Sequence, residues 1–180
     1  MPERRHEFRG IHDREMVRSG VEIDIEDLGQ RARMTLTATR VGHRFPTYVV
    51  PRVTLTGVGL DEAGRAIPGS RRTWIIQRRV ASGAGGWKEI SDTRLKPGQS
   101  ARVAVPWTLG KEKVQRIHFQ VSIDPDHYYR EEVYADLLKT MQPGPARDLI
   151  VQADREARDN RFILFDRKVE KTRENKETNP

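Results

Sequence analysis

The chain has 180 residues, of which 36% are hydrophobic and 33% are charged, and its formal net charge is +7. This length fits one domain with a single core and some additional length for tails. Cysteine is absent, which excludes disulfides, zinc–thiolate sites, thiol catalysis and covalent haem attachment through a C-x-x-C-H motif, because each of these needs the sulfur.

The excess of basic residues would favour an anionic partner, but 26 acidic residues are interspersed with the 33 basic ones. We therefore expect a mixed, well-solvated surface. No segment approaches the roughly 18 apolar residues that a membrane span needs, and the first 20 residues lack the apolar region of a signal peptide. The sequence predicts no membrane span and shows no export signal.

The first 20 residues contain two of the five histidines and no apolar run, so we expect an irregular lead segment over 1–20. A β-rich region follows over 21–124. VEIDI from Val21 alternates apolar and polar residues, and the run from Val114 places Ile117, Phe119, Val121 and Ile123 on one face. About seven short strands with turn residues between them predict an antiparallel β-sandwich of immunoglobulin-like architecture.

The pattern changes period after Asp124. REEVYADLLKTM places Val133, Leu137 and Met141 on one helical face, and Pro145 suits the first position of a second helix. The fold class is therefore mainly β, with two C-terminal α-helices over 125–166. The segment 167–180 has one aliphatic residue and many charges, which predicts a disordered tail.

Arginines flank the strand TWII at positions 71, 72, 78 and 79 and would make one sheet face basic. Nucleic-acid binding would require aromatic residues interleaved with that charge, and only Trp74 is close by. We expect no nucleic-acid partner.

The stretch VGHRFPTYVVP is the most informative candidate for a site. Pro46 restricts Phe45 to an extended conformation and Gly42 permits a tight bend, so His43 is held on a stiff loop between two strands. Such a loop positions a side chain well. The residues leave two roles open for His43: a loop residue hydrogen-bonded to the backbone, or a ligand or catalytic group.

A resemblance rests on MPERRHEFRGIHDREM together with this loop. The chain resembles the cysteine-free C-terminal domain of multihaem c-type cytochromes, which follows the last C-x-x-C-H motif and carries a G-H-x-x-P-T loop. Gly42, His43, Pro46 and Thr47 match that loop, and the similarity extends from Met1 to about Tyr134. The haem-attachment motifs of the family are missing here.

The resemblance implies that haem is carried by a partner chain or by a missing upstream segment. A sixth iron ligand would come from His12 or His43, with His6 next, while Arg9 and Arg44 would face haem propionates. It further implies a non-enzymatic role in electron transfer and a periplasmic or extracellular location. The alternatives are a free-standing sandwich module that binds a protein or a sugar through Trp87 and Trp107, and an enzyme that uses His43.

Overall fold

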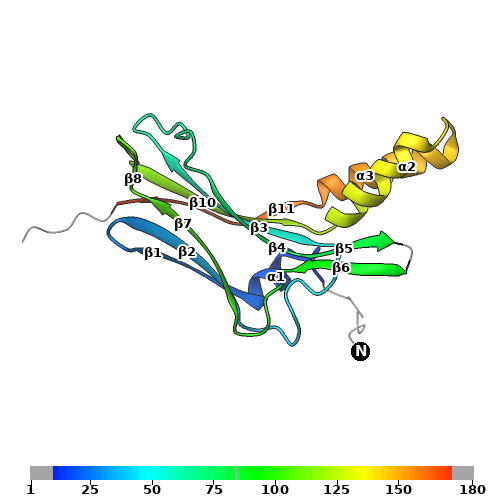
Figure 1. The fold of residues 1–180 in the computed structure, drawn as a ribbon, viewed down its shortest axis with the longest axis horizontal. Helices are drawn as coiled ribbons and strands as arrows, with labels where there is room; N and C mark the ends of the chain where they lie inside the picture. Colours follow the sequence, from blue (N-terminus) through cyan, green and yellow to red (C-terminus); the bar gives the residue numbers. More distant parts are fainter. Residues whose placement is uncertain (1–9, 84, 172–180) are drawn as a thin grey trace, which may run out of the picture.

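The computed structural model describes residues 10–83 and 85–171, and two facing antiparallel sheets form its main body. One sheet has the order β1-β2-β7, with β1 at Val21–Asp27, β2 at Arg31–Ala38 and β7 at Ser100–Pro106. The other has the order β11-β10-β3-β4, with β11 at Phe162–Glu170, β10 at Arg116–Asp124, β3 at Arg52–Leu60 and β4 at Arg72–Ile76. Figure 1 shows the two sheets as layers along the long axis of the molecule.

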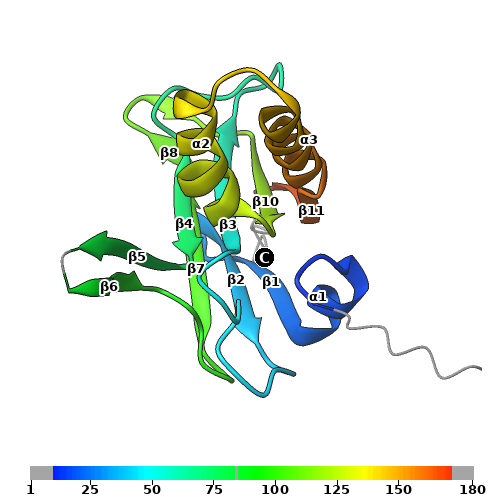
Figure 2. The ribbon, with the colours of Figure 1, turned by 90° about the vertical axis from the view of Figure 1, so that its right-hand side faces the viewer.

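The remaining elements lie around this sandwich. Two hairpins are formed by β5 (Arg78–Gly83) with β6 (Gly86–Asp92), and by β8 (Thr108–Leu109) with β9 (Glu112–Lys113). The helices are α1 (Arg14–Gly20), the π-helix η1 (Tyr129–Tyr134), α2 (Ala135–Thr140) and α3 (Pro145–Asp159). The β5–β6 hairpin projects from the sandwich, and α2 and α3 stand together at one end (Figure 2). No helix within 10–83 or 85–171 is long and apolar enough to cross a membrane.

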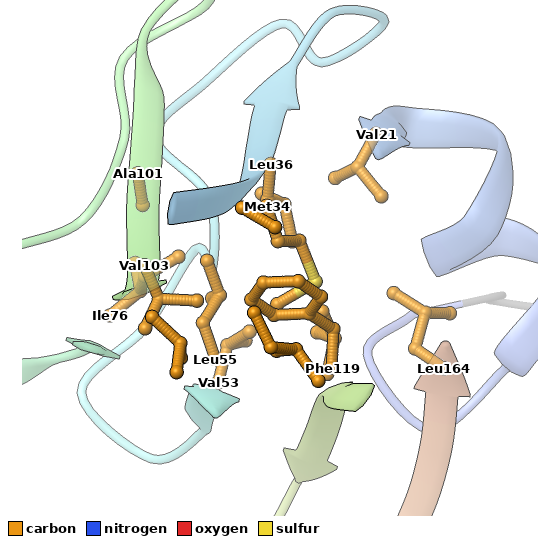
Figure 3. Close-up of a cluster of buried hydrophobic side chains, with 14 of the residues drawn as sticks. Val21, Met34, Leu36, Val53, Leu55, Ile76, Ala101, Val103, Phe119 and Leu164 are labelled. Atoms are coloured by element: carbon orange, nitrogen blue, oxygen red, sulfur yellow. The ribbon is translucent and has the colours of Figure 1, made fainter. Parts of the chain in front are cut away.

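The core lies between the two sheets, as the alternating patterns predict. Phe119 of β10 is fully buried, and Met34 and Leu36 of β2 are fully buried opposite it. Figure 3 shows these side chains converging with Leu55. Gly57 of β3 allows the Phe119 ring to lie close to the β3 backbone, because a Cβ atom at position 57 would lie 2.9 Å from that ring. The prediction of a mainly β antiparallel sandwich with C-terminal helices is confirmed.

The lead segment is more ordered than the sequence predicts. Its described part contains α1, where the Asp13 carboxylate accepts a hydrogen bond of 2.9 Å from the Met16 amide. This interaction caps the first turn of the helix. At the other end, the Gly20 carbonyl accepts hydrogen bonds from the Thr39 and Arg40 amides, which join α1 to the loop after β2. The expectation of an irregular segment is therefore corrected for Arg14–Gly20.

The expected end of the helical region and the start of the tail form a strand instead. β11 runs from Phe162 to Glu170 and pairs antiparallel with β10, with Arg116 opposite Glu170. A strand at a sheet edge tolerates exposed charges such as Arg167 and Lys168, and these charges are the reason that composition alone suggested disorder. The last expected tail residues, 172–180, lie outside the described part of the chain.

Candidate functional site

The stretch that carries His43 forms an irregular loop over residues 39–51 between β2 and β3, here named the histidine loop. Phe45 anchors it, because its ring is buried and its amide and carbonyl each form a 2.8 Å hydrogen bond with Leu95. Pro46 and Pro51 are fully buried. The tips of the loop are exposed while these three side chains are held in the interior, so the loop is fixed to the sandwich.

An ion pair also fastens the histidine loop. The Arg94 guanidinium donates a 2.6 Å hydrogen bond to the Thr47 carbonyl and binds Asp92 through two further bonds of 2.9 and 2.8 Å. The bond from Arg94 lowers the pKa of Asp92 to about 2, against the opposing effect of burial. Arg44 adds a weaker attraction, with its Nη1 atom 3.7 Å from Asp92 Oδ2.

Acid is therefore expected to weaken the Asp92–Arg94 ion pair that fastens the histidine loop. The pKa of Asp92 is about 2 in the folded chain and has its ordinary value of 3.8 in the unfolded chain. The ionised carboxylate therefore stabilises the fold fully above pH 3.8, and this stabilisation is lost as the pH falls to about 2. In urea unfolding between pH 2 and 6, the difference in unfolding free energy between the native chain and Asp92→Asn should shrink with acidification. Asp136→Asn, which removes an exposed partner of Lys139, is the control. A difference that does not vary with pH would contradict the role of Asp92.

His43 lies on the exposed part of the histidine loop. Its Nδ1 atom lies 3.1 Å from the Arg44 carbonyl, and the Thr47 hydroxyl lies 3.2 Å from Nδ1 and 3.4 Å from Nε2. A carbonyl can only accept, so the bond to Arg44 requires a protonated Nδ1 and leaves the lone pair on Nε2. A backbone carbonyl that fixes the tautomer in this way is typical of histidines that bind a metal through the other nitrogen.

A pocket of about 410 Å³ joins the histidine loop to the lead segment. His43 and Tyr48 contribute from the loop, and Ile11, Met16 and Val17 contribute from the lead segment. Most of these side chains are apolar, while the His43 imidazole and the Met16 thioether are the groups among them that can bind iron. The structure therefore brings together the two segments on which the resemblance rests.

His12 does not line this pocket. Its Nε2 atom lies 3.0 Å from both carboxylate oxygens of Asp126, which also accepts a 2.8 Å hydrogen bond from Asn160. The contact links the lead segment to the helical region, and the His12 ring remains half exposed. In this arrangement only Nδ1 of His12 is available to an external partner.

The other predicted site residues are placed as follows. Arg44 is partly exposed beside the pocket and is attracted to Asp92, so its charge is already partly balanced. His6 and Arg9 lie outside the described residues. Their predicted roles, like those of His12, His43 and Arg44, stay predictions. Within the described residues, no group of three or more metal-binding side chains lies together.

Sequence reasoning missed several residues that form or support this site. Met16 and Tyr48 line the pocket with exposed side chains, and Arg94 holds the histidine loop through Thr47. Arg94 lies 47 residues from Thr47, and no local pattern connects them. Of the two tryptophans named for a binding module, Trp87 is 67% exposed on the β5–β6 hairpin and Trp107 is buried.

The fold and the site define a cysteine-free β-sandwich with an anchored histidine loop and a helical extension. No protein-family model and no curated protein matches this sequence. A solved structure with a similar fold is the penta-haem cytochrome c552 from Thermochromatium tepidum, with a TM-score of 0.56 and 14% sequence identity. The similarity covers 92% of this chain and 43% of that protein, so the chain spans less than half of its length.

Proposed function

We propose that this chain is an accessory β-sandwich domain or subunit of a multihaem cytochrome, and that it packs against haem carried by a partner chain or by another segment. The absence of cysteine means that this chain attaches no haem c covalently. The similarity of its fold to part of a penta-haem cytochrome supports the proposal. In this role the chain assists electron transfer without catalysing a reaction, in the periplasm or outside the cell.

His43 is the residue that we propose as an axial ligand. The observation that carries this assignment is the bond from Nδ1 to the Arg44 carbonyl, because it leaves the lone pair on Nε2, where an iron would replace the 3.4 Å contact with the Thr47 hydroxyl. A haem iron in such proteins supplies the one-electron couple, and a neutral imidazole at its sixth position favours the low-spin state. The apolar pocket beside His43 would exclude water from the haem face, and Arg44 would lie near a propionate.

A ferric haem c peptide that carries its own proximal histidine tests this assignment, because its sixth position is open. Adding the native chain should convert the peptide to a low-spin form with a shifted Soret band. His43→Ala should lose at least about 90% of that shift, since it removes the nitrogen with the available lone pair. His118→Ala is the matched control, because His118 is held by Asp166 at 2.8 Å on β10.

The same titration distinguishes His43 from His12, the other candidate histidine among the described residues. If His12→Ala removes the shift and His43→Ala does not, the ligand assignment passes to His12, which would have to leave Asp126 or bind through Nδ1. If no variant changes the spectrum and the native chain gives no shift, axial ligation by this chain is wrong. Thermal melting of each variant verifies that the fold is retained.

A second candidate function is a free-standing module that binds a protein or a sugar. An aromatic group at the projecting hairpin favours it, because exposed Trp87 meets Tyr128 edge to face with ring centroids 6.3 Å apart. Tyr129 continues the group at 6.2 Å from Tyr128. Exposed aromatic residues are typical of such binding surfaces. In this case Trp87→Ala would abolish binding to the partner and His43→Ala would leave it unchanged.

A further inference from the structure

A second pocket, of about 650 Å³, lies where α1, β3, β10, η1, α3 and β11 meet, and here it is named the arginine pocket. It is lined by five arginines at positions 14, 52, 130, 158 and 161, and by His127. Two carboxylates, Asp124 and Glu131, belong to the same lining. With a neutral His127, five positive and two negative charges leave a formal charge of +3 on the wall of this pocket.

Two of the five arginines are already paired with carboxylates. Arg130 binds Asp124 at 2.6 Å and Glu131 at 2.5 Å, and Arg158 binds Asp154 at 2.9 Å. Asp124 and Glu131, the two acidic residues of the lining, are thus both paired with Arg130.

The other three arginines have no carboxylate partner within residues 10–83 and 85–171. Arg14 lies over the Phe162 ring at 5.4 Å, and Arg161 donates through Nε to the Arg158 carbonyl at 2.9 Å. Arg52 donates through Nη1 to His127 Nε2 at 3.4 Å. Each of these contacts leaves most of the guanidinium N–H donors unused, since a guanidinium has five. Three cationic donor groups therefore line one pocket without a balancing anion.

Unsatisfied polar atoms are concentrated in the same place. In the described part of the chain, five buried side-chain atoms lack a hydrogen-bond partner, and four of them belong to the arginine pocket: Arg52 Nε, Asp124 Oδ1, His127 Nδ1 and Arg130 Nε. The His127 nitrogen lies 3.4 Å from Asp124 Oδ2, near enough for attraction but without hydrogen-bond geometry. Three of the four are donors, because His127 Nε2 accepts from Arg52. Clusters of this kind are normally completed by ordered water or a bound ion.

We propose that the arginine pocket binds a doubly charged tetrahedral oxyanion of the phosphate or sulfate class. The planar guanidinium groups of Arg14, Arg52 and Arg161 can each present paired N–H donors to such an anion. Two negative charges match the formal charge of the wall better than one. Ile123, Phe162 and Ile163 supply an apolar side, where charge attraction is less screened than in bulk water. This site does not depend on haem.

Calorimetric titration of the native chain with inorganic phosphate, at constant ionic strength in chloride buffer, tests this site. We expect saturable binding, competition by sulfate and none by acetate at equal concentration.

Arg52→Gln and Arg161→Gln should each weaken phosphate binding about tenfold or more, because each removes a charge-assisted hydrogen bond. Arg102→Gln removes the same charge from the exposed face of β7 and should leave binding unchanged. Glycerol phosphate, titrated in parallel, distinguishes a free ion from the phosphate group of a larger molecule.

Melting curves provide a second readout that does not require tight binding. Phosphate should raise the melting temperature of the native chain and of Arg102→Gln, and should raise that of Arg161→Gln much less. Arg161 is exposed, so its replacement leaves the core intact. Absence of saturable phosphate and sulfate binding, or equal weakening by Arg161→Gln and Arg102→Gln, would overturn the proposal. Neither result bears on haem ligation by His43, because no haem is present.

Discussion

Phe119→Ala is expected to lower the free energy of unfolding by about 3–5 kcal/mol, the largest effect of any single substitution considered for this chain. The ring is fully buried between the sheets, and Gly57 on the neighbouring strand provides the space for it. Removing the ring leaves a cavity that strands fixed by hydrogen bonds on both sides cannot close. Urea unfolding followed by circular dichroism measures the change.

The matched control is Phe165→Ala on β11, whose ring is partly buried at the edge of the same core. It removes an equal number of atoms from a less enclosed position, so the expected loss is smaller. If the two variants were equally stable, the core would not be centred on Phe119.

Arg130→Ala is expected to lower the free energy of unfolding by about 3 kcal/mol, because it leaves Asp124 as a charge without its closest partner. The two side chains are only 10% and 15% exposed, and they lie 2.6 Å apart. Burial by itself would raise the pKa of Asp124, but attraction to His127 and the bond from Arg130 more than offset this, and the pKa lies below its usual value. Without Arg130 that pKa should rise.

Lys139→Ala is the comparison for this effect. The Lys139–Asp136 pair has a similar distance of 2.9 Å, but its side chains are 71% and 72% exposed. An exposed pair of this kind contributes little, because solvent and salt screen it. Equal losses in the two variants, measured by urea unfolding at pH 7, would show that the Asp124–Arg130 pair is screened by solvent.

The sandwich could be predicted because its inner residues follow period two. Ile117, Phe119, Val121 and Ile123 are all buried, and the strand that carries them is central in its sheet. β6 and β11 gave no such signal. Almost every side chain of β6 is exposed, and in β11 the apolar run FILF is followed by the charged residues Asp166, Arg167 and Lys168, so neither strand follows period two along its length.

The candidate site was partly predictable for a different reason. Gly42 and Pro46 are local signals of a constrained loop, and they correctly indicated that His43 is presented between two strands. The backbone bond expected as one of its two roles is present, and it is compatible with the other role because an imidazole has two nitrogens. The contact between His12 and Asp126 joins residues 114 positions apart, and only the fold brings them together.

The proposed function depends most on coordination, by the His43 imidazole, of an iron that this chain does not itself attach. Its most direct test is electron–nuclear double resonance on an unlabelled ferric haem c peptide bound to chain labelled with ¹⁵N in its histidines. We expect a strongly coupled ¹⁵N nucleus on the low-spin iron, and we expect it to be absent when the His43→Ala chain is used. A low-spin or high-spin complex in which every coordinated nitrogen is ¹⁴N would contradict it.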